Sequence, residues 1–172
     1  MLVDYDPAWP GLFQEAAVEL RRLGDPEWEI EHIGSTAVPG LKAKPIIDVA
    51  VRILDAAALE PHLHRLEGAG WRIGSGVRTH PVLVFEPEGI RTRIAHFFPQ
   101  EQWEHANQRL LRDWLLTHPD DAATYEITKI AAAQRAADGD GRYNGGKTAI
   151  IQQIVDKARA SRGLPAVPVY DK

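Results

Sequence analysis

The sequence predicts an α+β fold of the α/β type, in which a mixed β-sheet with flanking helices is followed by a helical C-terminal half. Two observations predict it: all strand-like segments lie within residues 1–100, and helix-forming segments fill residues 101–162. With 172 residues, 44% of them hydrophobic and 26% charged, the chain has the size and composition of one globular domain. We expect that domain over residues 1–162 and an extended tail over residues 163–172.

The first hundred residues alternate between helical and strand patterns. Asp6 caps a helix and Pro7 fits its first position, since proline there loses no hydrogen bond. Alternating polar and apolar residues predict a half-buried strand, and a later β-branched run predicts a strand in the centre of the sheet. The predicted elements are a helix over 7–23, strands over 27–33 and 45–54 around a turn or short helix over 34–41, a helix over 55–69, a short strand over 71–73 and a hairpin with strands over 82–85 and 90–98.

Helix-forming residues dominate the C-terminal half of the chain. Their apolar spacing predicts helices over 101–117, 119–137 and 147–162. Pro165 and Pro168 then predict that the tail is extended.

The composition excludes several classes of protein. The chain contains no cysteine, which excludes a disulfide scaffold, a thiolate metal site and a cysteine nucleophile. Its formal net charge of -4 is unlike that of general nucleic-acid-binding proteins, for which a basic excess is typical. The acidic start is unlike a signal peptide, and the apolar runs are too short to span a membrane. We therefore expect a cytoplasmic protein that binds neither membranes nor nucleic acid in general.

A glycine-serine turn between two predicted strands is the most informative segment. Gly34 and Ser35 follow the first strand, and Asp48 stands on the next one. Such a turn lets backbone N–H groups approach a phosphate closely, and an aspartate beside it can hold a magnesium ion that bridges the phosphates. The alternative is that the glycine only allows the bend and that Asp48 hydrogen-bonds to the turn.

This arrangement resembles the nucleotidyltransferase superfamily of the polymerase-beta type. Its signature is a hydrophobic residue, Gly, Gly or Ser, a spacer, and then acid-hydrophobic-acid-hydrophobic. The resemblance implies that Gly34 and Ser35 hold a triphosphate and that Asp48 binds magnesium. At the position of the second acid this chain has Ala50, and the later strand that normally supplies a third acid offers His96. One carboxylate does not make a two-metal clamp.

Longer strings give a second and more specific resemblance. They are YDPAWP at 5–10, EHIGSTAVPGL at 31–41, KPIID at 44–48 and LRDWL at 111–115. Together they resemble the GrpB family, small bacterial proteins with a nucleotidyltransferase-like fold, over residues 3 to 160. Family members usually carry His-hydrophobic-His on the later strand, where this chain has Ile94 in place of the first histidine. The residues that we add to the predicted ligand site on these grounds are His32, Thr36, Lys44, Arg112, Lys129, Tyr143 and Lys147.

A phosphate-loop pattern near the C-terminus has the wrong context. Residues 141–148 read Gly, four residues, Gly-Lys-Thr, but a true phosphate loop joins a buried strand to a helix. Here the preceding residues 131–137 form helix, and few residues follow. A weaker interpretation remains: Gly145 and Gly146 open a helix, and a helix N-terminus with Lys147 can bind an anion.

Two histidines lie on predicted strands among apolar neighbours. His32 and His96 therefore have the surroundings of hydrogen-bonded core residues, but near Asp48 either one could be a metal ligand or a general base. The other histidines do not have this setting. We expect these residues on the surface: His62, His64, His80 and His105.

Three functions are consistent with these patterns. The first is magnesium-dependent transfer of a nucleotide to a small acceptor, with Asp48 and His96 as catalytic residues and Lys44, Lys129 or Lys147 neutralising the developing charge. The second is binding of a nucleotide or another phosphorylated small molecule without chemistry. The third is a structural or partner-binding protein. Whether the protein is an enzyme is left open by the sequence.

Overall fold

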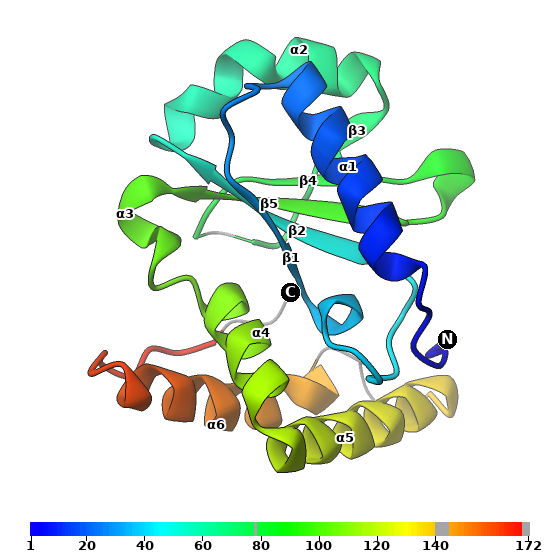
Figure 1. Ribbon diagram of the computed structural model, residues 1–172. Coiled ribbons are helices and arrows are strands. Elements are labelled where there is room, and N and C mark those ends of the chain that lie inside the picture. The colour runs from blue at the N-terminus through cyan, green and yellow to red at the C-terminus, as the bar shows by residue number, and fades with distance from the viewer. Residues whose placement is uncertain (78, 140–144, 170–172) are drawn as a thin grey trace.

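A five-stranded mixed sheet forms the N-terminal half of the protein (Figure 1). The computed structural model describes residues 1–77, 79–139 and 145–169. The strands lie in the order β1-β2-β5-β4-β3, with β2 parallel to β5 and the other pairs antiparallel. This confirms the predicted α+β class with a mixed sheet. Their bounds are β1 (Ile30–Ile33), β2 (Ile47–Ile53), β3 (Trp71–Ile73), β4 (Val82–Phe85) and β5 (Arg93–Pro99).

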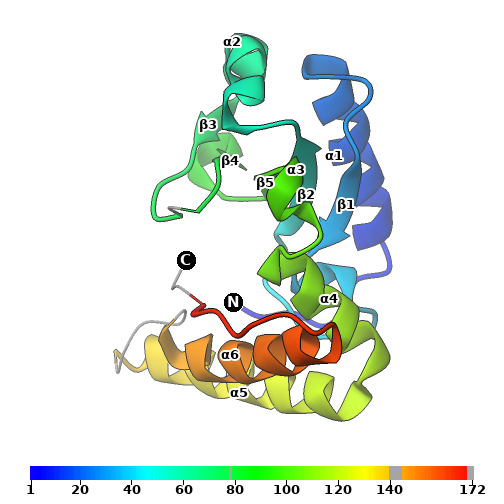
Figure 2. The same ribbon diagram turned by 90° about the vertical axis from the view of Figure 1, so that its left-hand side faces the viewer.

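Helices cover the sheet and then form the second half of the chain. Figure 2 shows α5 and α6 side by side at one end of the molecule, away from α2. Among the described residues, no helix is long and apolar enough to cross a membrane. The helices are α1 (Trp9–Leu23), α2 (Glu60–Gly68), α3 (Gln100–Trp103), α4 (Asn107–Thr117), α5 (Pro119–Ala137) and α6 (Gly145–Ser161), with short 3-10 turns at Ser35–Ala37, Ala56–Leu59 and Pro87–Gly89.

The two faces of the sheet contact different parts of the protein, because successive side chains along a strand point to opposite faces. On β2, Val49 and Val51 are fully buried in the main core, together with Leu20 of α1 and Leu66 of α2. Asp48 and Ala50, at the alternate positions of the same strand, therefore face away from that core. The candidate site is built on this second face.

Several predicted elements differ from the observed ones. The predicted helix over 55–69 consists of a 3-10 turn at Ala56–Leu59 followed by α2, and the last strand begins at Arg93 and not at 90. The first helix begins at Trp9 and not at Pro7, because the Asp6 carboxylate accepts from the backbone N–H of Ala8 in a turn before the helix. The first strand begins at Ile30 and not at 27. The predicted helix over 101–117 is divided into α3 and α4, which leaves room for Trp103 to bury its ring in the core of the second face.

The loop between β1 and β2 joins the two halves of the molecule. Val38 and Leu41 of this loop lie outside the sheet. They are buried in a small core with Leu115 of α4, Tyr125 of α5 and Ile154 of α6. The distinctive Val-Pro-Gly-Leu string therefore anchors the helices to the sheet. This placement fixes where residues of α5 and α6 lie relative to the glycine-serine turn.

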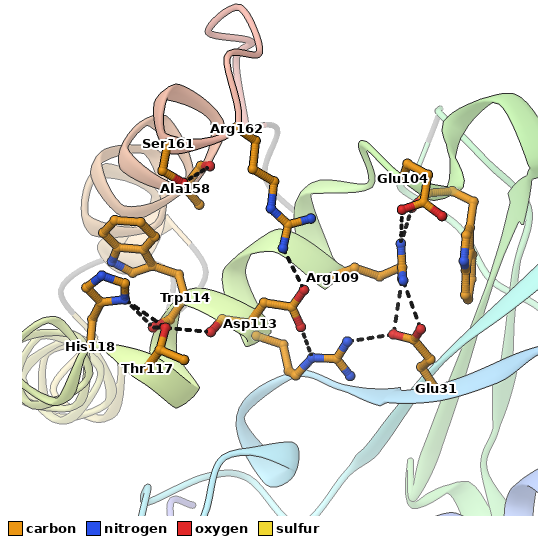
Figure 3. Close-up of polar contacts among 12 residues, drawn as sticks. Glu31, Glu104, Arg109, Asp113, Trp114, Thr117, His118, Ala158, Ser161 and Arg162 are labelled. Atoms are coloured by element: carbon orange, nitrogen blue, oxygen red, sulfur yellow. Dashed lines mark hydrogen bonds and ion pairs between the residues drawn. The ribbon is translucent and has the colours of Figure 1, made fainter.

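A chain of ion pairs forms a second connection between the sheet and the helices (Figure 3). Glu31 of β1 accepts from Arg109 and Arg112 of α4, at 2.8 and 2.5 Å. Arg112 also pairs with Asp113, which pairs in turn with Arg162 at the end of α6. Burial opposes ionisation of Glu31, but the hydrogen bonds and charges of the two arginines outweigh it and lower the pKa of Glu31.

Loss of the Glu31 charge is expected to destabilise the fold. Glu31→Gln leaves two partly buried guanidinium groups with less compensation, and we expect the free energy of unfolding to fall by about 2 kcal/mol. Glu29→Gln is the matched control, because the exposed pair of Glu29 with Arg52 contributes about 0.5 kcal/mol or less. Urea denaturation of both variants measures the difference, and equal effects would contradict this role for Glu31.

Candidate functional site

The glycine-serine turn lies directly against the Asp48 carboxylate. Ile33 and Asp48 are partners in the antiparallel β1–β2 pair, so the turn starts beside Asp48. Gly34 has φ +73° and ψ -174°, a conformation that essentially only glycine adopts. A Cβ at position 34 would lie 2.4 Å from Asp48 Oδ2. Glycine is therefore required here both by the backbone conformation and by the close approach of the carboxylate.

Helix α5 brings a tyrosine and a lysine to the same turn. The Ser35 and Tyr125 hydroxyl oxygens are 3.5 Å apart. Lys129 donates from Nζ to the carbonyl of Lys42 and lies 4.9 Å from the centre of the Tyr125 ring. Burial raises the pKa of Tyr125, an effect that the hydrogen bond from Ser35 opposes and the charge of Asp48 assists. Tyr125 therefore remains a neutral phenol close to both Ser35 and Asp48.

Lys129 and Lys147 place positive charge beside the turn. Lys129 is almost fully buried, and burial together with the charge of Lys147 lowers its pKa to about 8, which Glu126 only partly opposes. Lys147 is half-buried in the first turn of α6. The positive charge of each lysine disfavours the charged form of the other. A bound anion would stabilise both charged forms.

On the other side of Asp48 lies a pair of buried histidines. His96 Nε2 is 3.8 Å from Asp48 Oδ1, and His96 Nδ1 is 2.9 Å from His80 Nε2. The expectation that His80 lies on the surface is wrong: its side chain is only 7% exposed. Val82, the first residue of β4, pairs with His96 across the hairpin. His80 stands just before β4, so the hairpin brings its side chain against His96. The register of the hairpin was the signal that could have found it.

Apolar packing occupies the place of the second signature acid. Ala50 is fully buried with Ile33, Phe98 and Trp103. Glu31 is the partner of Ala50 on β1, but its carboxylate is bound by two arginines. Within the part of the chain that the structure describes, histidines and carboxylates do not gather in threes as a metal site would require. The donors present therefore do not fit a two-metal clamp.

Three of the predicted ligand-binding residues support the turn instead of lining it. His32 points toward α1, where its ring stacks on Phe13 with 4.9 Å between the ring centres. Its Nε2 is 2.9 Å from the hydroxyl of buried Thr36, which donates to the carbonyl of Ile46. Burial lowers the pKa of His32 to about 4, against the charge of Asp48, so it is neutral at pH 7. Arg112 donates to the His32 carbonyl and belongs to the ion-pair chain.

The remaining predicted residues lie in different settings. Lys44 is half-buried on the loop that leads into β2, where burial lowers its pKa. Tyr143 lies outside the residues that the structure describes. The structure thus brings together one set of predicted residues on the second face of the sheet and the facing helices: Gly34, Ser35, Asp48, His96, Lys129 and Lys147.

Substitution of Gly34 is expected to disrupt the turn. Gly34→Ala combines an unfavourable backbone conformation with a clash against Asp48, and we expect it to lower the free energy of unfolding by about 3 kcal/mol. Gly40→Ala is the control: its φ is also positive, +81°, but a Cβ there meets nothing within 4 Å, so about 1 kcal/mol is expected. Chemical denaturation tests this, and an equal loss in the two variants would show that the approach to Asp48 is unimportant.

Comparisons with known proteins agree with the resemblance found in the sequence. The model of the GrpB protein family matches residues 1–157. A UPF0157 protein from Pseudomonas aeruginosa is 39% identical over 170 residues, which cover 94% of this chain and 69% of that protein. The crystal structure of conserved protein GrpB from Enterococcus faecalis superposes with a TM-score of 0.84 at 29% identity, over 95% of this chain and 99% of that one.

A more distant neighbour shows the wider fold. Terminal uridylyl transferase 4 from Trypanosoma brucei, solved with bound dUTP, superposes with a TM-score of 0.56 at 16% identity. The superposition covers 96% of this chain and 57% of the other. At this identity the likeness shows the fold alone, and that fold is nucleotidyltransferase-like.

Proposed function

The chain belongs to the GrpB family, and from that premise we propose that it binds a nucleotide or another phosphorylated small molecule between the glycine-serine turn and the lysines of α5 and α6. The observation that carries the proposal is the convergence of Ser35, Tyr125 and Lys129 at one place, with Lys147 close enough to influence Lys129. Ser35 comes from the turn after β1, and the others come from two helices of the C-terminal half.

The electrostatics of this place favour an anion. Burying an ammonium group beside a second one is unfavourable, and Lys129 bears that cost even while it hydrogen-bonds to the Lys42 carbonyl. Lys147 stands in the first turn of α6, where the helix dipole already carries positive charge and a lysine is disfavoured. A phosphate near both lysines would relieve the repulsion and would meet the N-terminus of α6.

The geometry favours binding over nucleotidyl transfer. Transfer with two magnesium ions would need a second carboxylate beside Asp48, and that position is occupied by Ala50 within an apolar cluster. Binding needs only the close backbone at Gly34, a hydroxyl such as Ser35 and the two lysines. Asp48 remains available to contact another part of the same ligand.

A binding panel tests this proposal. Purified protein is titrated with nucleoside triphosphates and with inorganic tripolyphosphate, each with magnesium and with EDTA, and followed by thermal shift and calorimetry. We expect saturable binding, with stabilisation of about 2.7 kcal/mol at a ligand concentration 100 times the dissociation constant. Lys147→Ala should weaken binding by about tenfold or more, the equivalent of about 1.4 kcal/mol for a lost charged contact.

Lys157→Ala is the matched control for this panel. Lys157 is also on α6, but it is exposed and pairs with Asp121, so its loss should leave the affinity unchanged. Absence of binding to every phosphorylated compound in the panel would overturn the proposal. Equal weakening by the two lysine variants would overturn the assigned location.

The affinity is also expected to depend on pH through Lys129. A nearby anion favours the charged ammonium, so binding raises the pKa of Lys129 above its free value of about 8. Affinity is then complete below that value and falls as the pH rises toward the pKa of the complex. We expect tripolyphosphate to bind about tenfold more weakly at about pH 9 than at about pH 7. Lys129→Met should remove this extra dependence, and an identical profile in that variant would refute it.

A further inference from the structure

A hydrogen-bonded chain that phosphate binding does not use ends at His96, which lies next to the Asp48 carboxylate. The hydroxyl oxygen of Thr79 is 2.9 Å from His80 Nδ1, and His80 Nε2 is 2.9 Å from His96 Nδ1. His96 Nε2 faces Asp48 Oδ1 at 3.8 Å. The two imidazole rings are buried, and Phe98 packs on His80 with 4.2 Å between the ring centres. These side chains thus form a row that leads from the exposed Thr79 to the carboxylate of the candidate site.

The charge of Asp48 favours one direction of hydrogen-bond donation along this row of side chains. The 3.8 Å between His96 Nε2 and Asp48 Oδ1 is too long for a direct hydrogen bond, but the negative charge of the carboxylate favours the His96 tautomer that carries its proton on Nε2, toward Asp48. Nδ1 of His96 is then an acceptor, and His80 must donate to it from Nε2. Nδ1 of His80 in turn accepts from the Thr79 hydroxyl. In this arrangement each of the two histidines carries a proton on Nε2, the ring nitrogen on the side of Asp48.

The two oxygens of Asp48 therefore have different surroundings. Oδ1 faces the His96 donor, while Oδ2 lies against the backbone of Gly34 at the start of the turn. The Asp48 side chain is 25% exposed, so it is accessible to a ligand. A carboxylate repels phosphate, whereas Lys129, which lies 4.9 Å from the centre of the Tyr125 ring, and the neighbouring Lys147 attract it. The site therefore has a cationic end for phosphate and an anionic end for a group that donates hydrogen bonds.

We propose that Asp48 accepts a hydrogen bond from a hydroxyl group of the phosphorylated ligand, and that His80 is the positioning residue which, through His96, holds Asp48 for this contact. The inference rests on the proposed function and narrows it to ligands that carry both a phosphate and a hydroxyl, such as nucleoside and sugar phosphates. In the tautomer inferred here, Nε2 of His96 carries a proton and has no lone pair to offer a metal ion.

The first experiment determines the tautomers of His80 and His96 in the ligand-free protein. Nitrogen-15 NMR of the imidazole groups should show His80 and His96 each as a single neutral tautomer with the proton on Nε2, and a coupling across the hydrogen bond between them. His80→Leu removes the donor, and His96 should then lose its fixed tautomer. His80→Gln keeps an N–H donor and should restore it. His64→Leu, at an exposed position of α2, is the control. A proton on Nδ1 of His96 in the wild-type protein would overturn the inference.

The second experiment separates the hydroxyl contact from phosphate binding. Uridine triphosphate and tripolyphosphate are titrated in EDTA into the wild-type protein, His80→Leu and His80→Gln. We expect His80→Leu to weaken uridine triphosphate binding by about tenfold and to leave tripolyphosphate binding unchanged, while His80→Gln stays within about twofold of the wild type. Because tripolyphosphate has no hydroxyl group on carbon, a merely structural effect of the substitution would weaken both probes equally and would overturn the inference.

Failure of the inference is distinguishable from failure of the proposed function. If uridine triphosphate binds only with magnesium and its binding is lost in EDTA, Asp48 acts through a metal, and the inference is overturned while the proposed function stands. If neither probe binds under any condition, the proposed function fails and the hydroxyl role of Asp48 fails with it. The tautomers measured in the free protein still decide whether the histidine chain has the direction described.

Discussion

The insertion of the β1–β2 loop into the helical half is the interaction on which the candidate site depends. Val38 and Leu41 are buried among residues of α4, α5 and α6, and next to them the Lys42 backbone accepts from Lys129 and donates to Glu126. One short segment therefore carries the glycine-serine turn on one side and holds α5 on the other. Burial of these side chains brings together polar groups that are 84 and 90 positions apart in the sequence.

The charge distribution that results is divided between the two halves. The sheet and the segment before β4 contribute the Asp48 carboxylate and the two histidines behind it, and the helices contribute Lys129 and Lys147. At the position two residues after Asp48 on β2, Ala50 is buried with Trp103, and a carboxylate there would be removed from water without a partner. Recognition of a polar, phosphorylated molecule is the chemistry that such a divided site supports.

Local patterns were sufficient to predict the class of fold and several of the residues that the structure brings together around the glycine-serine turn. Alternation identified the strands, and the motif strings placed Gly34 beside Asp48 and indicated the family. What they could not predict depends on contacts between distant segments. The break between α3 and α4 follows from burial of Trp103, and the buried position of His80 follows from the register of β4 against β5. The roles of residues such as Arg112, which binds Glu31 across 81 positions of the sequence, require the same knowledge of packing.

The most direct test of the account is to locate a bound anion in solution. Backbone amide resonances of nitrogen-15-labelled protein are followed while tripolyphosphate is added. The account predicts saturable shifts, with one common dissociation constant, at residues 34–36 of the turn and at residues 145–148 of α6, and little change in β3 and β4. Shifts confined to α6, or spread over exposed lysines without saturation, would contradict a site formed jointly by the sheet and the helices.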